Sequence, residues 1–295
     1  MSESAEPLAR NEPNESAEPI EAFRALVWRE GARLYRDLPW RDTRDAWLVL
    51  LSEVMLQQTQ VKRVVNYWQR WAEAFPNADA LAAASVTDVL AFWQGLGYNR
   101  RALALKRAAE KIADEHAGQL PRSYLALLEL PGIGPATAAG VCIFAYDQPL
   151  VYLETNVRAV FLHHFFAGAH QVADKQLVPL IEAACDRENP RDWYYALLDY
   201  GNHLKATLPN PSRASLHHTS QSRFEGSRRQ KRAFLLRELL ALQHASTDQL
   251  SASLNAAERK AGRTALTAEE VAVILHSLAD EGFICAVGDV WRVVA

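Results

Sequence analysis

Residues 130–134 read Leu130-Pro131-Gly132-Ile133-Gly134 and separate two stretches with the apolar periodicity of helices, 122–129 and 135–146. The two glycines allow backbone conformations that other residues avoid, so the chain can reverse tightly here. Ile133 would anchor the turn in the core. The N–H groups that open the second helix are free to hold an anion. This stretch therefore predicts two helices joined by a hairpin whose backbone can bind an anionic group.

Helical periodicity continues on both sides of the hairpin, and prolines or glycines stand at the breaks. Nothing between residues 21 and 205 alternates convincingly as a strand would. Besides the two helices at the hairpin, the pattern predicts helices over 22–37, 45–58, 61–75, 86–93, 99–115, 155–167, 175–184 and 191–205. The fold class that it predicts is all-α.

The C-terminal part of the chain has a different pattern. Residues 206–228 lose periodicity and are basic, and a helix follows at about 229–243. Ser246-x-x-Gln249 and Thr267-x-x-Glu270 are capping boxes that predict two further helix starts. The chain then reads FICAVGDVWRVV, which predicts a hairpin around Gly288–Asp289. Three helices and a hairpin are typical of a winged-helix domain, here 226–295.

Charge is unevenly distributed along the 295 residues, although the formal net charge is only −3. Residues 1–20 hold five Glu and one Arg and repeat ESAEP, which predicts a disordered acidic tail. Residues 200–232 hold seven Lys or Arg and one acid, which indicates a candidate phosphate-binding surface. Residues 233–295 hold five Lys or Arg and eight Asp or Glu. That balance favours a protein-contact or structural role for the winged-helix domain.

Cysteine usage and hydropathy bear on the compartment. Cys142, Cys185 and Cys285 lie far apart and form neither a CxxC motif nor a disulfide framework. The N-terminus lacks the apolar core of a signal peptide, and no stretch is as long and apolar as a membrane span. We expect a cytoplasmic, nucleoid-associated protein without a membrane segment.

Several motifs together carry a resemblance to a known family. Along the chain, LPW stands at 38–40, SEVMLQQTQV at 52–61, GLGY at 95–98, LPGIG at 130–134 and LETNVR at 153–158. In this order and spacing they resemble the HhH-GPD DNA glycosylase superfamily, in its MutY-type adenine glycosylase branch, over about residues 22–205. The resemblance implies a two-lobed helix-hairpin-helix module at 21–225. One lobe would be 45–140 and the other 21–44 with 141–225, with a flipped base held between them.

The resemblance also implies roles for three site residues. Glu53 matches the general acid that protonates the leaving base, which requires a raised pKa through desolvation. Glu154 matches an Asp that stabilises positive charge on the sugar, and it is one methylene longer. Asn156 matches an active-site Asn of the branch. The amides of Gln57 and Gln58 would enter the gap in the DNA, and the hairpin would hold a phosphate. The predicted DNA-binding residues are Gln57, Gln58, Asn99, Gly132, Gly134, Ala136, Thr137, Arg228 and Arg229.

The chain departs from the family pattern at several places. Ala136 stands where bifunctional relatives carry Lys, so no Schiff-base lyase activity is expected. Asn99 replaces an aromatic residue in GLGYY, in the loop that probes the lesion. Residues 202–227, where the family's cysteines would lie, contain none, so we expect no iron–sulfur cluster and no other cofactor. The winged-helix prediction replaces the family's NUDIX-like domain, so a preference for 8-oxoguanine does not carry over.

The sequence thus favours a monomeric, monofunctional base-excision-repair glycosylase that hydrolyses the N-glycosidic bond of a flipped base, adenine first. Its partner would be duplex DNA with a damaged or mispaired base, with a possible protein partner at the winged helix. Two alternatives use the same scaffold: a pyrimidine-mismatch glycosylase, or an abasic-site endonuclease with a metal held by His163, His164, His217 and His218 together with Glu154 or Asp186. A non-catalytic DNA-repair binding protein is the third alternative, and Glu53 argues against it.

Overall fold

The computed structural model describes residues 19–219 and 222–294. The predicted acidic tail therefore lies almost wholly outside the described residues. Within the described residues the chain forms two compact units. The described part of the first is 19–53, 122–128 and 134–219, and that of the second is 54–121, 129–133 and 222–294. The domain boundaries expected from the sequence, at 45, 140 and 226, stay predictions.

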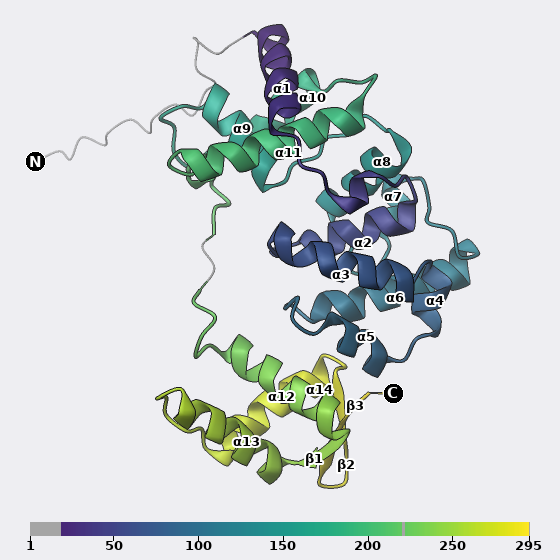
Figure 1. Cartoon of the computed structure of the whole chain (residues 1–295), viewed down its shortest axis with the longest axis vertical. Coiled ribbons are helices and arrows are strands. Elements are labelled where there is room, and N and C mark those ends of the chain that lie inside the picture. The colour runs from purple at the N-terminus through teal and green to yellow at the C-terminus, as the bar shows by residue number, and fades with distance from the viewer. Residues whose placement is uncertain (1–18, 220–221, 295) are drawn as a thin grey trace, which may run out of the picture. The chain divides into compact units, whose positions relative to one another are not determined.

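The first unit is helical. Its elements are α1 (Ile20–Leu34), the 3-10 turn η1 (Pro39–Arg41), most of α2 (Ala46–Leu56), α7 (Tyr124–Leu128), α8 (Pro135–Tyr146), α9 (Thr155–Phe165), α10 (Asp174–Ala184), α11 (Pro190–Thr207) and the 3-10 turn η2 (Pro211–Ala214). Helix α11 packs against both α1 and α9, as Figure 1 shows. A Cβ atom at Gly31 would overlap Ala196, so the glycine lets α1 approach α11 closely.

An aromatic cluster fills the core of this unit. The ring centroid of Phe23 on α1 lies 5.1 Å from that of Phe161 and 5.0 Å from that of Phe165, both on α9. Trp193 of α11 closes the cluster edge-on, 6.4 Å from Phe23. All four side chains are buried. Fully burying a side chain of this size contributes about 1.5–3 kcal/mol, so the cluster fixes α1, α9 and α11 against one another.

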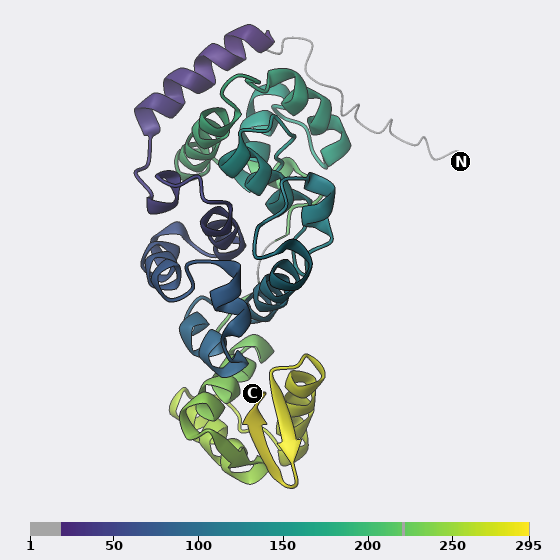
Figure 2. The same cartoon turned by 90° about the vertical axis from the view of Figure 1, so that its right-hand side faces the viewer.

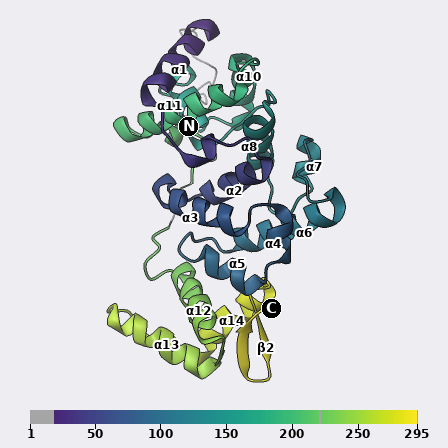
Figure 3. The ribbon, with the colours of Figure 1, turned by 45° about the vertical axis from the view of Figure 1, so that its right-hand side comes forward.

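The second unit begins with the end of α2 and continues with α3 (Val61–Ala74), α4 (Ala78–Ala83), α5 (Val86–Trp93) and α6 (Arg100–His116). Helix α6 packs against α4 and α5, and Figure 3 shows α4 beside α6. Short α4, which the sequence pattern did not predict, begins where the Asn77 side chain accepts a hydrogen bond from the Ala80 N–H.

The C-terminal part of this unit contains α12 (Arg228–Leu242), β1 (His244–Ser246), α13 (Thr247–Lys260), α14 (Ala268–Asp280), β2 (Ile284–Val287) and β3 (Val290–Val293). The predicted capping boxes at Ser246 and Thr267 are both present, which confirms the two helix starts. The predicted hairpin is confirmed as well, with Gly288 at φ 61, and Figure 2 shows its strands side by side. The winged-helix assignment remains a prediction.

Strand β1 was not predicted. It pairs antiparallel with β3, so the sheet has the order β1-β3-β2. Its three residues, His-Ala-Ser, carry no alternating apolar pattern, and only the pairing partner makes them a strand. The predominantly helical class expected from the sequence is confirmed. No helix among the described residues is long and apolar enough to cross a membrane.

Candidate active site

Glu53 ends the first segment of the first unit and lies on α2, where it is half-buried. Its Oε2 accepts a 3.0 Å hydrogen bond from the Tyr152 hydroxyl. The carboxyl group also lies against α8 at Gly140, where an added Cβ atom would overlap Oε2. Glycine at this position makes room for the acid, which is a packing reason that the sequence pattern did not reveal.

The surroundings of Glu53 favour its protonated form. Burial raises the pKa of Glu53 to about 8, because the charged carboxylate loses solvation. The Tyr152 hydrogen bond lowers this pKa, and the negative charge of Glu154 raises it further. Tyr152 keeps its own proton, since burial and the two acids hold its pKa well above the ordinary value. Glu53 therefore retains a proton at neutral pH, as the predicted general acid requires.

Glu154 occupies the N-cap position of α9. Its Oε1 accepts hydrogen bonds from the backbone N–H groups of Asn156, at 2.5 Å, and Val157, at 3.0 Å. The longer side chain thus folds back and caps the helix as a shorter Asp would. Burial raises the pKa of Glu154, while the two N–H groups and the cations of Lys205 and Arg158 lower it.

Asn156 connects Glu154 to α11. Its Nδ2 lies 3.4 Å from Glu154 Oε2, and its Oδ1 accepts a 3.0 Å hydrogen bond from Lys205 Nζ. A Cβ atom at Gly201 would overlap the Asn156 backbone, so α11 passes very close to the start of α9. The three predicted catalytic residues, Glu53, Glu154 and Asn156, all fall within the first unit.

A stack of aromatic and cationic groups forms the wall behind the acid. Phe144 lies edge-on to Tyr152, at 5.4 Å, and stacks on Tyr195 at 4.5 Å. The Arg41 guanidinium lies 4.4 Å from the Tyr195 ring and donates two 2.8 Å hydrogen bonds to buried Asp199. The wall is therefore held by a desolvated, bidentate ion pair, a strongly orienting interaction.

The predicted wedge residues lie just beyond α2 rather than on it. The helix ends at Leu56, two residues before the predicted end, and Gln57 and Gln58 form a turn in which Gln58 has φ 53. Amides are thus tolerated here because the backbone has left the buried helix. Within SEVMLQQTQV, Gln57 and Gln58 therefore belong to a turn in the second unit.

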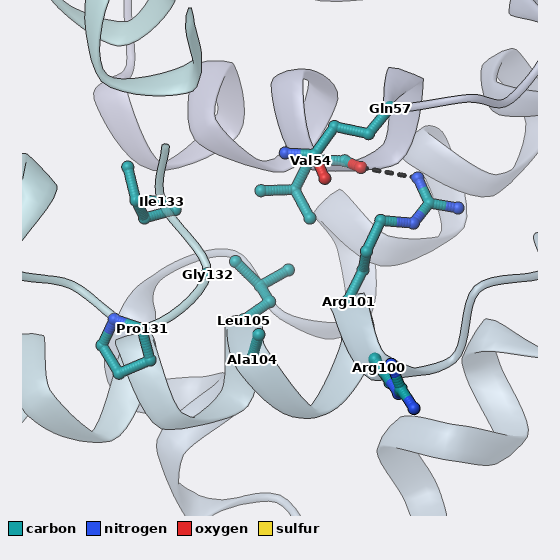
Figure 4. Close-up of a pocket in the computed structure, with 9 residues that line it drawn as sticks. All are labelled: Val54, Gln57, Arg100, Arg101, Ala104, Leu105, Pro131, Gly132 and Ile133. Atoms are coloured by element: carbon teal, nitrogen blue, oxygen red, sulfur yellow. Dashed lines mark hydrogen bonds between the residues drawn. The ribbon is translucent and has the colours of Figure 1, made fainter. Parts of the chain in front are cut away.

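Arg101 fixes that turn to the GLGY loop. It donates hydrogen bonds to the carbonyls of Val54, at 2.7 Å, and Met55, at 2.9 Å, at the end of α2 (Figure 4). It also donates to Thr59 Oγ1 and to the Gly97 carbonyl, both at 3.0 Å. Burial lowers the pKa of Arg101 to about 10, so the side chain remains charged at neutral pH.

The hairpin lies beside a cavity of about 200 Å³ in the second unit. Figure 4 shows its lining: Val54, Gln57, Arg100, Arg101, Ala104, Leu105, Pro131, Gly132 and Ile133. Gly132 has φ 76, and a Cβ atom there would overlap Ala104. The predicted need for glycine is confirmed at Gly132, with close packing on α6 as a second reason. It is wrong for Gly134, which has φ −92 and open space at its Cβ position.

The remaining predicted contacts of the hairpin open α8, in the first unit. Gly134 is the N-cap residue and Pro135 the first residue of the helix. Ala136 is half-buried, and the side chain of Thr137 is buried.

Tyr98, Asn99 and Arg229 meet in the second unit. Arg229 donates a 2.8 Å hydrogen bond to the Tyr98 hydroxyl and a 2.6 Å one to the Ser222 carbonyl. Tyr98 has φ 52 and is 37% exposed, and Asn99 stands at the start of α6. The loop has Asn99 in place of an aromatic residue, but it has an exposed aromatic residue at Tyr98, whose hydroxyl is bonded by Arg229.

The basic segment carries less available charge than its composition indicates. Arg232 pairs with Glu281 at 2.7 Å, and Lys231 lies 3.7 Å from Glu258. Arg228, by contrast, is exposed. Counting charges along the sequence cannot anticipate these ion pairs, because their acids lie 27 or more residues away along the chain.

The histidines considered for a metal site have other surroundings. His164 Nε2 lies 2.9 Å from the Tyr200 hydroxyl, and its ring packs edge-on to Phe23. Burial lowers the pKa of His164 to about 4. Over residues 19–219 and 222–294, no group of three or more His, Cys, Asp or Glu side chains could hold a metal ion.

Comparisons with solved structures define the class of fold. A thermostable thymine-DNA glycosylase superposes with a TM-score of 0.56 at 23% identity, over 62% of this chain and 85% of that one. An endonuclease III–DNA complex gives the same TM-score at 18% identity, over 64% of this chain and 89% of that one. The fold is that of the HhH-GPD glycosylases.

Sequence comparisons place the chain within that class. Residues 51–180 match the HhH-GPD superfamily base excision DNA repair protein family, and the chain belongs to this superfamily. It is 43% identical over 169 residues to the adenine DNA glycosylase of Mycolicibacterium smegmatis, covering 57% of this chain and 56% of that protein. It is 35% identical over 208 residues to that of Homo sapiens, covering 66% and 37%. The chain spans about half the length of the curated relatives it matches.

Three residues of the site were missed at the level of sequence. Tyr152 stands two residues before Glu154, Arg101 follows GLGYN closely, and Lys205 lies in the segment read as lacking cysteines. Proximity to recognised motifs was a usable signal for the first two. Lys205 had none, because it reaches Asn156 only through the packing of α11 on α9.

Proposed function

We propose that the chain is a base-excision-repair DNA glycosylase that removes adenine from a mispair by hydrolysing its N-glycosidic bond. The observation that carries the proposal is the protonated carboxyl of Glu53, held by Tyr152 in the same unit as the N-capping carboxyl of Glu154. Two acids with different surroundings match the two tasks of the reaction. The similar curated proteins are named adenine DNA glycosylases, which supports adenine as the base.

In the proposed reaction Glu53 gives its proton to the adenine ring as the bond to the sugar C1′ breaks, so the base leaves neutral. Tyr152 donates to Oε2, which leaves Oε1 as the oxygen that carries the proton. The negative charge of Glu154 stabilises the cationic sugar. Water then adds at C1′, and the proton that it loses restores Glu53.

The proposed enzyme is monofunctional and works without an iron–sulfur cluster. Ala136 offers no amine for a Schiff base at the start of α8. Cys142 lies buried within α8, Cys185 follows the end of α10, and Cys285 lies on β2 in the other unit. These three residues do not fit a four-cysteine site. Purified protein should be colourless, and stoichiometric iron and sulfide in it would contradict this part of the proposal.

DNA contacts are proposed for the residues that the sequence indicated. Gln57 and Gln58 would replace the stacking of the flipped base from their turn, with Asn99 in the neighbouring loop. The backbone around Gly132 and Gly134 would hold a phosphate. Arg228 and Arg229 would add phosphate contacts. The cytoplasmic, nucleoid-associated location, the monomeric state and a protein partner of the C-terminal domain remain predictions.

A panel of duplexes tests the proposal. The protein is incubated with duplexes carrying adenine opposite guanine, adenine opposite 8-oxoguanine, uracil, thymine opposite guanine, or an abasic site, with and without EDTA. We expect base release from the adenine duplexes, unaffected by EDTA, and strand cleavage only after alkali. Release of thymine or uracil alone would contradict adenine as the base. Cleavage of the abasic duplex that EDTA abolishes would support the endonuclease alternative instead.

A further inference from the structure

A chain of hydrogen bonds joins a lysine to the second carboxyl group. Lys205 Nζ donates to Asn156 Oδ1 at 3.0 Å, and Asn156 Nδ2 faces Glu154 Oε2 at 3.4 Å. An ammonium group donates but does not accept, so it selects the oxygen end of the amide. The NH2 end of Asn156 must then point towards Glu154. The lysine therefore sets the orientation of the amide beside the carboxylate.

The positive charge of Lys205 is also available to Glu154. Arg158, the other nearby cation, donates to both oxygens of Asp174, at 3.0 and 2.8 Å, and is neutralised by it. Lys205 instead bonds to a neutral amide. It is half-buried, where charges interact more strongly than in bulk water. The pKa of Glu154 is raised by burial and lowered by Lys205, so the lysine favours the ionised carboxylate.

The fold places this lysine with little freedom. Gly201 brings α11 against the Asn156 backbone, and Lys205 lies one helical turn further along the same face. The segment that follows is anchored to the same helix start. There the Ser212 hydroxyl lies 3.4 Å from the Thr155 carbonyl, and the backbone of Val172 bonds to Ala214 and Leu216. The position of Lys205 is thus fixed from both sides.

We propose that Lys205 is a positioning residue of this site, which orients the Asn156 amide and keeps Glu154 ionised while positive charge develops on the sugar. The proposal rests on the proposed function. A protonated Glu154 would give the sugar no negative charge, whereas an ionised one beside a partly solvated ammonium still does. The charged and titratable groups facing Glu154 are Lys205 on α11, Arg158 on α9, Glu53 on α2, and Tyr152.

The test compares Lys205→Met, which keeps the length of the side chain without charge, with Lys205→Arg, which keeps the charge. Lys175→Met, on the exposed face of α10 in the same unit, is the matched control. Release of adenine opposite guanine is measured under single-turnover conditions from pH 5 to 9. We expect Lys205→Met to lower the rate about 10- to 100-fold at neutral pH, as a small misplacement does. In Lys205→Met the pH at which the rate falls on the acidic side should rise by about one unit. Lys205→Arg should restore both the rate and this pH.

Three outcomes overturn the proposal or separate it from the proposed function. A normal rate and pH profile for Lys205→Met would overturn it. A second result would also overturn it: Lys205→Met lowers the rate without shifting the pH profile, and Lys205→Arg does not restore the rate. That result would mark a merely structural role. If the unaltered protein releases no base, the proposed function fails on its own. The carboxyl titration of Glu154, followed by carbon-13 NMR in the DNA-free protein, then decides: a higher pKa in Lys205→Met supports the inference, and an unchanged one contradicts it.

Discussion

Glu53 and Glu154 are both half-buried, but the groups around their carboxyls differ in kind. Glu53 meets a tyrosine hydroxyl and the bare backbone of a glycine. Glu154 accepts hydrogen bonds from two helix N–H groups and lies beside an amide, and the charges of Lys205 and Arg158 act on it without direct contact. Burial raises the pKa of both carboxyl groups, but at Glu154 the helix N–H groups and nearby positive charges lower it again.

The difference teaches that side-chain type does not assign the role of an acid here. In the proposed reaction the same residue type serves twice, and the surrounding groups distinguish the carboxyl that would donate a proton from the one that would remain negative. The following predictions begin with the largest expected effect; the first four change one side of this comparison, and the last separates DNA binding from it.

Replacing Glu53 with Gln removes the proton that the first carboxyl carries, while size and the Tyr152 contact are kept. We expect base release to fall on the order of 10²–10⁴-fold, the usual span for general acid–base catalysis. Affinity for the duplex should change little. Single-turnover excision and equilibrium binding measure the two quantities separately. Normal excision by this variant would remove Glu53 from the mechanism.

Replacing Glu154 with Gln removes the charge from the second carboxyl, while an amide oxygen can still accept from the α9 N–H groups. We expect base release to fall on the order of 10²–10³-fold, as when one preorganised electrostatic group is lost. Glu154→Asp, which also caps helices well, is the control that keeps the charge. A rate for Glu154→Gln above that of Glu154→Asp would refute a role for the negative charge.

Replacing Gly140 with Ala tests the shape of the Glu53 site without touching either acid. The new Cβ atom would overlap Oε2 and push the carboxyl group aside. A shift of about 1 Å can lower a rate about a hundredfold, so we expect a loss of that order. Ala usually favours a helix over Gly, so the melting temperature should not report the same loss. The idea fails if the variant is fully active.

The stability of the protein should depend on pH through Glu53. Its pKa is raised to about 8 in the folded chain, against 4.5 for the ordinary side chain. The folded state thus binds the extra proton between these values, and the stability from this group is lost as pH rises towards 8. Compared with Glu53→Gln, the unaltered protein should lose up to about 4 kcal/mol between pH 5 and 8. Urea denaturation of both proteins measures the difference, and parallel curves would contradict it.

Replacing Arg228 with Ala separates binding from chemistry, and its effect should be the smallest. Arg228 is exposed, whereas Arg232 is held by Glu281. We expect the slope of log K against log salt to flatten by about 0.9 if one phosphate contact is lost. The single-turnover rate at saturation should not change. Arg237→Ala, on the same helix and also exposed, is the matched control. An unchanged salt slope would show that Arg228 contacts no phosphate.

Much of the fold was predictable because its signals are local. Helical periodicity, capping boxes and the two-glycine hairpin act over a few residues, and α8 and both capped C-terminal helices begin where the sequence indicates. What was missed depends on partners far along the chain. Strand β1 exists only through β3, and the end of α2 depends on the Arg101 hydrogen bonds to its last carbonyls.

The candidate site divides in the same way. Glu53, Glu154 and Asn156 stand in recognisable motifs, so their identity could be expected. Their electrostatic surroundings could not, because Gly140 and Lys205 are 87 and 49 residues away from the groups that they contact. For the basic segment the sequence overstated the available positive charge, because the count of charges took no account of the ion pairs with Glu258 and Glu281.

The bridge between Val172 and Ser215 has a practical consequence for protein engineering. Val172 N–H donates to the Ala214 carbonyl at 2.8 Å, and Leu216 N–H donates to the Val172 carbonyl at 2.9 Å. Both bonds use backbone atoms alone, so they impose little demand on the side chains exposed nearby, at Arg213, Leu216 and His217. These positions form a site for randomised libraries or for attaching labels, provided that Leu216 is not replaced by proline, which would remove one of the two N–H donors.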